Sequence, residues 1–348
     1  MPQAIGHIST DDVREDDDVL RVEGLTISVG NRRGSGVVVE DVSFALRRGR
    51  TLGLIGESGS GKSVTALALL GLLPGAALSL TRGSIRFRGT DLAQLDSEGI
   101  RRFRGRYLSM VLQDPLSALN PVLSVGSQLS EPLRLHTKLR GGRLRQRAVE
   151  LLELMKIPSP ARRLKAYPHE MSGGMRQRVV GAIGIAADPE VLIADEPTTA
   201  LDVTVQAAYL ALLKEIQAKT GLGILFITHD FAVVGEICQD VAVMYAGRIV
   251  ETGTTEEIFG QARHPYTRAL LRSVPDVSRP PERLASIPGT PPSVFAMPSG
   301  CRFHPRCRLH EKLGRPAICC TRAPDLVTGA PGRAAACHFT ADAAGDAL

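Results

Sequence analysis

The sequence predicts an α/β fold built on a mainly parallel β-sheet, with a small antiparallel region before it and a helical insert inside it. Short, fully apolar runs at residues 52–55, 191–194 and 224–228 have the length of buried strands. Helical patterns separate these runs, and strands that alternate with helices pair in parallel through right-handed crossovers. Residues 20–46 alternate apolar and polar side chains around a Gly-rich turn, which is typical of an antiparallel hairpin.

The elements follow one another in a consistent order. A Gly-rich loop joins the strand at residues 52–55 to a helical run at 64–73. The helix between the two later strands places apolar side chains at i, i+3, i+4 and i+7, namely Tyr209, Leu212, Leu213 and Ile216. Residues 241–252 read as a hairpin around Ala246 and Gly247.

Changes in composition divide the chain into parts. Residues 1–18 are rich in Asp and Glu and poor in apolar side chains, so we expect a disordered acidic tail. Residues 19–262 form the main domain, and strand signals vanish within it over about residues 116–187, where a helical insert is expected. Residues 263–348 are rich in Pro, Arg and Cys and predict a C-terminal extension of little regular structure.

Composition limits the class of protein. With 348 residues and 43% hydrophobic content, the chain can bury a large core. The net charge of +6 is mild and the basic residues are scattered, which argues against a nucleic-acid surface. We interpret the densest basic run as a solvated helix face. It consists of Arg101, Arg102, Arg104 and Arg106.

One apolar stretch is long enough that a membrane-spanning helix has to be considered. Residues 63–81 carry no charged side chain and approach the roughly 20-residue length of a membrane span. Pro74 and Gly75 interrupt the stretch, so a buried core helix ending near Leu73 is expected instead. Residues 1–18 lack the basic and then apolar order of a secretory signal. We therefore expect the chain to stay in the cytoplasm.

The Gly-rich loop after residue 55 fits the phosphate-loop pattern. It is formed by Gly56, Glu57, Ser58, Gly59, Ser60, Gly61, Lys62 and Ser63. In this pattern the backbone N–H groups wrap nucleotide phosphates, and the dipole of the following helix favours the same negative charge. Lys62 is expected to reach the β- and γ-phosphates, and Ser63 to hold Mg²⁺.

Two adjacent carboxylates follow the strand at residues 191–194. Strand ends of open α/β sheets are where ligands bind, so Asp195 suits a water-mediated contact to Mg²⁺. Glu196 suits the general base that polarises the attacking water. By itself a strand ending in two acids is often only the start of a polar loop, and its meaning depends on the motifs around it.

A further motif resembles a known family. The octapeptide Met171-Ser172-Gly173-Gly174-Met175-Arg176-Gln177-Arg178 resembles the signature of the ABC ATPases, which other phosphate-loop enzymes lack. The family usually has Leu first and Gln fifth in this motif, whereas Met175 occurs in its peptide-importer branch. Gln113, Asp202 and His229 match the family's Q-loop, D-loop and switch histidine in order and spacing. The resemblance implies ATP as substrate, Gln113 as a further Mg²⁺ contact, and catalytic roles for Gln113 and His229 beside Glu196.

The resemblance also implies a composite site. In that family two ATPase subunits pair head to tail, so Ser172 and Gly174 would contact ATP held by the partner's phosphate loop, with Gly173 and Asp202 assigned to the same nucleotide. Backbone N–H groups at the start of a helix form a second anion-binding end, which fits this arrangement. ATP binding would then close the dimer interface, and hydrolysis would open it.

Three other segments, at residues 113–121, 167–170 and 264–271, resemble the peptide and nickel importer branch, and the similarity spans about residues 20–339. It implies an ATPase that couples hydrolysis to uptake of di- or oligopeptides, bound peripherally to the cytoplasmic face of the cell membrane. The implied partners are two membrane-spanning permease subunits, a second ABC ATPase in a heterodimer, and a periplasmic or lipoprotein substrate-binding protein. No nucleic-acid partner is expected.

Several alternatives stay open at this point. The cargo could be nickel, because specificity resides in other subunits. A soluble ABC ATPase acting on nucleic acid or ribosomes would typically carry a second cassette, a coiled coil or zinc modules, and a non-hydrolysing regulator would not need Glu196 and His229. Residues 25–33 lack the aromatic residue on which the family stacks adenine. Adenine would then rest on Val29 or under the guanidinium group of Arg32 or Arg33, which leaves the preference for ATP over GTP open.

Cysteines gather at four separated positions near the C-terminus, which in a reducing cytosol suggests a metal or cluster before a disulfide. The sequence around Cys301, Cys307 and Cys337 resembles the cluster-bearing extension of some peptide-importer ATPases. It implies a structural [4Fe–4S] cluster held by these three residues and Cys319, chosen over Cys320 because family members place a proline five residues later, as at Pro324. Spacing alone does not give this result, and Zn²⁺ and unligated thiols are the alternatives.

Overall fold

The computed structural model describes residues 17–31, 34–75, 77–273, 286–330 and 332–340. Most of the predicted acidic tail, residues 1–16, lies outside these ranges. Asp18 was placed in that tail, but it opens the first strand, where its carboxylate accepts a hydrogen bond from Arg21 at 2.7 Å. Two sheets with helices packed around them give the predicted α/β class.

The smaller sheet contains the predicted hairpin. Its four antiparallel strands stand in the order β2-β1-β4-β5. Their bounds are β1 Asp18–Asn31, β2 Gly34–Arg47, β4 Leu78–Phe87 and β5 Thr90–Asp91. Val42, Phe44 and Leu46 alternate with exposed residues along β2 and are buried, so the period-two pattern marks the face that packs inward.

The larger sheet has eight strands in the order β11-β12-β10-β9-β3-β8-β7-β6. The five strands from β9 to β6 run parallel and form its centre. They are β3 Thr51–Ile55, β6 Leu108–Val111, β7 Val191–Asp195, β8 Gly223–Thr228 and β9 Asp240–Tyr245. Every residue of β3, β7 and β8 is buried, which explains why their sequences are apolar apart from Thr51, Asp195 and Thr228 at the strand ends.

The predicted hairpin at residues 241–252 is formed by β9 and β10 (Arg248–Thr254), which pair antiparallel. Strand β6 was not predicted, because it is only four residues long and two of them are half-buried. Such a run gives little periodicity from which to distinguish a strand from a loop.

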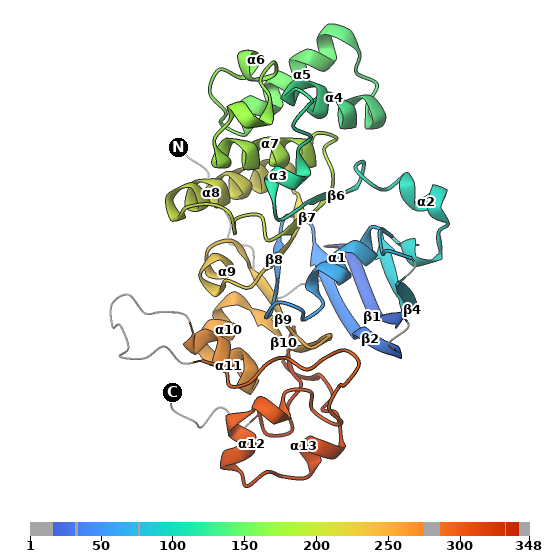
Figure 1. Cartoon of the computed structure of the whole chain (residues 1–348), viewed down its shortest axis with the longest axis vertical. Helices are drawn as coiled ribbons and strands as arrows, with labels where there is room; N and C mark the ends of the chain where they lie inside the picture. Colours follow the sequence, from blue (N-terminus) through green and yellow to red (C-terminus); the bar gives the residue numbers. More distant parts are fainter. Residues whose placement is uncertain (1–16, 32–33, 76, 274–285, 331, 341–348) are drawn as a thin grey trace, which may run out of the picture.

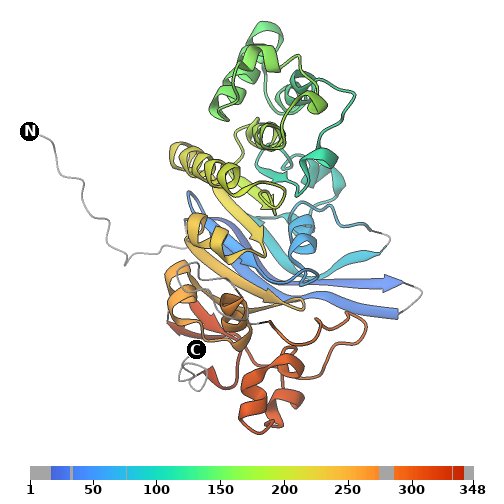
Figure 2. The same cartoon turned by 60° about the vertical axis from the view of Figure 1, so that its left-hand side comes forward.

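The predicted helical insert lies between β6 and β7, where residues 116–187 contain no strand. Its helices form one end of the molecule in Figures 1 and 2, with the sheets in the middle and the extension at the other end. They are α3 Pro115–Ala118, α4 Val125–His136, α5 Gly141–Leu154, α6 Pro160–Arg163, the 3₁₀ turn η3 Pro168–Glu170, and α7 Gly173–Ile185.

The remaining helices surround the sheets. The long helix α8 (Val203–Thr220) buries Tyr209, Leu212, Leu213 and Ile216, as its apolar spacing predicts. The others are α1 Lys62–Leu69, η2 Leu92–Gln94, α2 Ser97–Arg101 and α9 Phe231–Ile237. Helix α1 ends at Leu69 rather than near Leu73, and none of the described helices is both long and apolar enough to cross a membrane.

The densest arginine run is not a continuous helix face, which corrects the prediction. Helix α2 ends at Arg101, and the chain then turns toward β6. Arg104 donates to the carbonyl oxygens of Leu70 and Gly71 at 2.6 and 2.9 Å, and Arg106 donates to that of His136 at 3.0 Å. Two of these arginines thus satisfy carbonyl groups at helix ends, where a cation is favourable.

The C-terminal extension has more regular structure than predicted. It includes α11 Pro265–Arg272, η4 His304–Arg306, α12 Arg308–Lys312, α13 Ile318–Thr321, β11 Val327–Ala330 and β12 Arg333–Ala335, after α10 Thr255–Gln261. Strand β12 pairs with β10, with Ala335 opposite Glu251, so the extension completes the main sheet. A three-residue strand carries no periodic signal, which is why the sequence did not predict it.

Buried polar groups stabilise the junction between the main sheet and the C-terminal extension. Glu251 is fully buried and accepts the backbone N–H groups of Arg263 and His264 at 2.6 and 3.0 Å. His264 caps α11, because its Nδ1 accepts the N–H of Tyr266 at 3.0 Å. Burial lowers the pKa of His264 to about 3, so the ring is neutral at pH 7 and its Nδ1 can accept this bond.

Candidate active site

The phosphate loop leaves the sheet at the carboxyl end of β3. Gly59 and Gly61 have φ of 78° and 105°, a backbone region that favours glycine. A side chain at Gly56 would collide with the carbonyl oxygen of Met244 on β9, so only glycine fits there. The loop is therefore held close against the sheet, and its last glycine leads directly into α1.

Lys62 lies inside this loop. Only 5% of the residue is exposed, and its Nζ donates to the carbonyl oxygens of Gly56 and Glu57 at 2.7 and 3.0 Å. Burial lowers the pKa of Lys62, while the negative charges of Glu196, Asp195 and Glu57 oppose that shift. The ammonium group thus lies among carboxylates and loop carbonyls, where a polyphosphate would provide further negative charge.

The two predicted carboxylates occupy different positions at the end of β7. Asp195 is buried and accepts a hydrogen bond from the Ser63 hydroxyl at 3.2 Å. Burial raises the pKa of Asp195, and the Ser63 hydrogen bond opposes this shift. Oxygen ligands of this kind suit Mg²⁺, which usually keeps several of its waters. The Ser63 and Asp195 oxygens are thus suited to hold Mg²⁺, and the predicted contact of Gln113 to the ion stays a prediction.

Glu196 is aimed at the site by an unusual backbone conformation. Its φ is 47°, in the left-handed region that non-glycine residues rarely adopt, and its N–H donates to the carbonyl oxygen of Ile227 at 2.9 Å. Strained residues of this kind concentrate at functional sites, where the surrounding structure enforces them.

Three side chains surround the Glu196 carboxylate. Gln113 Nε2 and Thr199 Oγ1 both donate to Oε2, at 2.9 and 3.1 Å, and His229 Nδ1 lies 3.1 Å from Oε1. Gln113 follows β6 and His229 follows β8, so the groups come from neighbouring strand ends. A carboxylate fixed in this way can accept a proton from a water molecule bound beside it.

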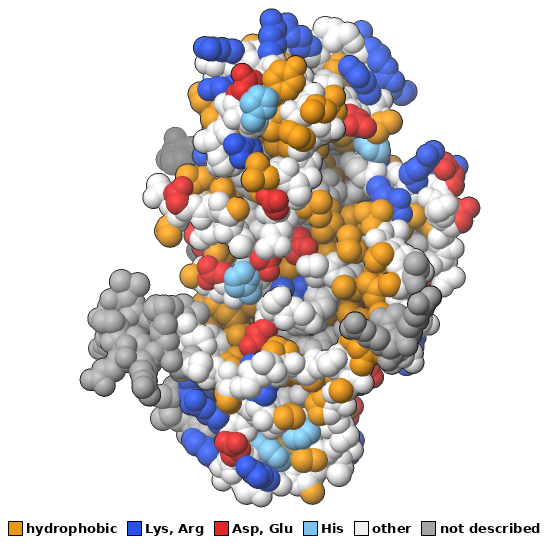
Figure 3. Space-filling view, in the orientation of Figure 1, with side chains coloured by type: hydrophobic (Ala, Val, Ile, Leu, Met, Phe, Trp, Pro, Cys, Tyr) orange, Lys and Arg blue, Asp and Glu red, His pale blue; other side chains and the backbone are white. Residues whose placement is uncertain are grey.

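These groups share one cavity. It is lined by Val38, Gly56, Glu57, Ser58, Gly59, Gly61, Lys62, Ser63, Val64, Gln113, Glu196, Thr199, His229 and Leu270. Figure 3 shows acidic, basic and histidine side chains together near the middle of this face. Ser60 and Asp195 do not line the cavity, and both are buried.

Sequence reasoning missed four lining residues, which are Val38, Val64, Thr199 and Leu270. Val38, on β2, lines the cavity, whereas Val29, proposed as an adenine contact, does not, and Arg32 and Arg33 lie outside the described residues. Thr199 bonds to Glu196, and its place three residues after the carboxylate could have indicated this. No signal in the sequence pointed to Leu270, which reaches the cavity from α11.

The signature residues lie apart from this cavity. Ser172, Gly173, Gly174 and Asp202 are not among its lining residues. Ser172 caps α7 and is exposed, with its Oγ accepting the N–H of Met175 at 3.4 Å. A Cβ on Gly174 would lie 2.6 Å from Val205 Cγ1, so glycine permits α7 to pack closely on α8. Asp202 caps α8 and accepts the Val205 N–H at 2.9 Å.

The four predicted cysteine ligands line one apolar cavity in the extension. Cys301, Cys307, Cys319 and Cys337 contribute to its wall, and Cys320 does not. Burial raises the pKa of the Cys301 and Cys337 thiols, to about 11 and about 12. Within the described ranges, no group of three or more His, Cys, Asp or Glu residues is arranged to hold a metal ion. The thiols thus gather around one cavity without forming a ligand set.

The site combines a loop that can wrap phosphates with a carboxylate that can accept a proton from water. This combination is typical of phosphate-loop nucleotide hydrolases. Residues 39–199 match the family described as ABC transporter, and residues 250–312 match the oligopeptide/dipeptide transporter C-terminal region. The chain is 48% identical to the dipeptide transport ATP-binding protein DppD of Bacillus subtilis, over 83% of this chain and 86% of that protein. A putative peptide import ATP-binding protein of Brucella abortus is 46% identical, over 92% of this chain and 94% of its own length. The chain therefore belongs to the ABC transporter family of ATP-binding proteins and is an ATPase.

Solved structures agree with this assignment. The cbiO1 protein of Clostridium perfringens, part of an ABC transporter complex, is 28% identical with a TM-score of 0.61, over 70% of this chain and 91% of that one. A dimeric ATP-binding cassette in a post-hydrolysis state with ADP and Pi is 24% identical, over 68% of this chain and 98% of that one, and its TM-score of 0.61 shows the shared fold.

Hydrolysis of ATP is expected to depend on the Glu196 carboxylate as the proton acceptor. In Glu196→Gln the side-chain shape is kept but the proton acceptor is lost, so ATP hydrolysis by the assembled complex should fall by about 10²–10⁴-fold. Nucleotide affinity should hold, because the loop is untouched. Glu215→Gln, which changes an exposed carboxylate paired with Lys156 and Lys219, is the matched control and should hydrolyse ATP normally. Normal turnover in Glu196→Gln would show that another group is the base.

Proposed function

We propose that the chain is the ATP-hydrolysing subunit of an importer that takes up di- or oligopeptides, acting at the cytoplasmic face of the membrane. The observation that carries the proposal is the joint match of the ATPase region and the oligopeptide/dipeptide C-terminal region within one chain. The names of the relatives support the peptide cargo over the nickel alternative.

The residues on the cavity have distinct roles in this proposal. The backbone N–H groups of the loop and Lys62 bind the phosphates, and Ser63 with Asp195 is suited to Mg²⁺, which would offset charge on the phosphate oxygens. Glu196 accepts the proton of the attacking water. His229 and Gln113 hold its two oxygens in place. Gln113 also joins the site to the helical insert, because the insert begins just after it at α3.

The chain acts together with a second ATPase in this proposal. Ser172 and Gly173 are exposed at the start of α7 and lie outside the chain's own cavity, so their N–H groups are available to a nucleotide on another subunit. Gly174 lets the start of α7 pack against Val205 on α8, and Asp202 caps the start of α8. A related but different ATPase is the proposed mate.

The helical insert offers a surface to membrane partners. Leu116, in α3, and Val122, in the loop after it, are 62% and 75% exposed, and Leu123 is exposed as well. Exposed apolar side chains close together mark an interaction surface. We assign this surface to the two permease subunits, which would in turn receive cargo from a substrate-binding protein. Residues 19–262 would form the ATPase domain, and residues 263–348 its extension.

Uptake into membrane vesicles tests the cargo. Vesicles that contain this chain with its permeases and binding protein should accumulate a labelled di- or oligopeptide only when ATP is present on the side of this chain. Omission of ATP is the control for passive leakage. Uptake of Ni²⁺ in place of peptide would contradict the peptide proposal and favour the nickel alternative.

We also propose that Cys301, Cys307, Cys319 and Cys337 hold a structural [4Fe–4S] cluster. The shared cavity supports this set, since thiolates are the usual ligands of such clusters, and movement of the cavity walls would still be needed to form the ligand set. Cys320 Sγ instead lies 4.0 Å from His310 Nε2. The cluster would stabilise an extension with few apolar residues of its own. Zn²⁺ is the alternative occupant.

Metal analysis of anaerobically purified protein tests this assignment. We expect brown protein with iron and acid-labile sulfide, and loss of both in Cys319→Ser. Cys320→Ser, which changes the adjacent thiol, is the matched control and should keep its colour. Colourless protein with stoichiometric zinc, or equal loss in the two variants, would overturn the proposed ligand set.

A further inference from the structure

A side-chain ion pair joins the C-terminal extension to the phosphate loop. Arg306, in η4, directs both terminal nitrogens at the Glu57 carboxylate, with Nη1 to Oε2 at 2.7 Å and Nη2 to Oε1 at 3.0 Å. The two residues are 249 positions apart in the chain. The side chain of Arg306 is 6% exposed and that of Glu57 is 26% exposed, so the pair is largely withdrawn from water. A bidentate contact of this kind fixes the relative orientation of the two side chains and also pairs their charges.

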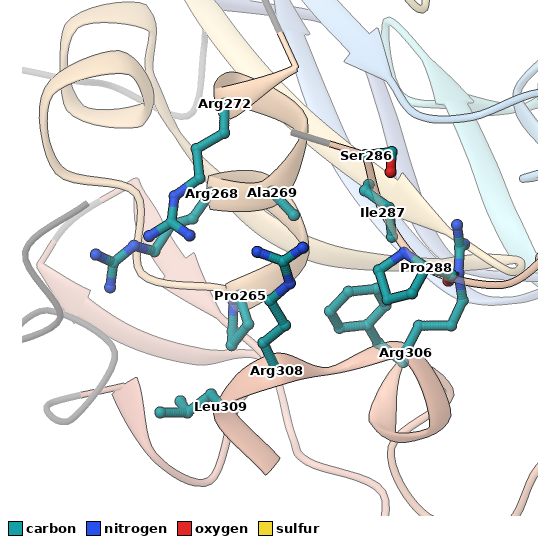
Figure 4. Close-up of a pocket in the computed structure, with 11 residues that line it drawn as sticks. Pro265, Arg268, Ala269, Arg272, Ser286, Ile287, Pro288, Arg306, Arg308 and Leu309 are labelled. Atoms are coloured by element: carbon teal, nitrogen blue, oxygen red, sulfur yellow. The ribbon is translucent and has the colours of Figure 1, made fainter. Parts of the chain in front are cut away.

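Both partners are themselves held in place. Arg306 Nε donates to the carbonyl oxygen of Pro288 at 2.8 Å, and Nη1 also donates to the Tyr245 hydroxyl at 3.3 Å. On the loop, the Glu57 N–H donates to the Tyr266 hydroxyl at 2.9 Å. Figure 4 shows Arg306 beside Pro288, directed away from Arg308, which belongs to the same segment of the chain.

Three aromatic side chains pack together next to this ion pair. The rings of Tyr245 and Tyr266 lie 4.6 Å apart, and each contacts Phe303, at 5.2 and 5.3 Å. Phe303 is the residue before η4, and Tyr266 belongs to α11. Strand β9, the extension and the loop therefore meet at one buried point.

The charge of Glu57 makes this contact important for nucleotide binding. Its carboxylate belongs to a loop whose task is to hold anionic phosphates, and an unpaired negative charge there opposes their binding. Breaking a buried pair by removal of one partner leaves such an uncompensated charge. The pair to Arg306 neutralises Glu57 and fixes its position in the loop.

We propose that Arg306 is a positioning residue for ATP binding, through which the C-terminal extension holds the phosphate loop in its binding conformation and offsets the charge of Glu57. Arg306 acts through Glu57 and is not required to touch the nucleotide. The proposal rests on the ATPase activity of the chain and is independent of which cargo is carried or which metal the thiols hold.

The kinetics of ATP hydrolysis by the assembled complex test this role. Arg306→Met should raise the KM for ATP about tenfold while kcat stays within about twofold, because binding is weakened equally in the ground state and the transition state. The double variant Glu57→Gln with Arg306→Met should recover most of the lost affinity, since it removes the uncompensated charge. Arg308→Met, which changes an arginine two residues further along the chain that does not line the cavity of the phosphate loop, is the matched control and should keep the parental KM.

Three outcomes would overturn the proposal. They are an unchanged KM in Arg306→Met, a double variant as weak as the single one, and an equal rise of KM in Arg308→Met. If Arg306→Met does not fold, Arg306→Lys provides the same test, because it keeps the charge but loses the two-pronged contact. A rise in KM of about threefold is then expected, and a parental KM would contradict the positioning role.

Discussion

The site depends on the parallel pairing of three buried strands. Because β3, β7 and β8 run in the same direction side by side, their carboxyl ends meet at one edge of the sheet. The phosphate loop, the carboxylate pair and His229 each follow one of these ends. Because every residue of these strands is buried and polar residues stand at their ends, a slip in register would carry those polar groups into the core, so the burial that stabilises the core also fixes the distances between the site residues.

The C-terminal extension is part of the ATPase structure as well as an addition to it. Strand β12 continues the main sheet, Leu270 lines the nucleotide cavity, and Arg306 pairs with the loop. Arg302 also bonds to Glu40 on β2 and to the Ala246 carbonyl next to the loop. Arginines that join the extension to the ATPase domain therefore stand next to cysteines of the thiol cavity in the sequence, since Arg302 follows Cys301 and Arg306 precedes Cys307.

Much of this arrangement could be predicted from the sequence, and the reasons for the rest are physical. The loop and Glu196 were predictable because their chemistry depends on short, contiguous patterns next to apolar strands. Val38, Leu270 and the partner of Glu57 were not, because they meet only after strands and helices far apart in the sequence have packed together. Strands β6 and β12 were not predicted, because their four and three residues are too few to show a hydrophobic period.

In the proposed pairing, the chain supplies one half of each ATP site and a second ATPase supplies the other half. The measurement that tests it most directly is photo-crosslinking from a photoreactive amino acid placed at position 172 in the assembled complex. The account predicts a crosslink to the phosphate loop of the partner ATPase that increases when ATP is bound and hydrolysis is blocked. A crosslink to residues 56–63 of the same chain, or a crosslink to the partner that ATP does not change, would contradict it.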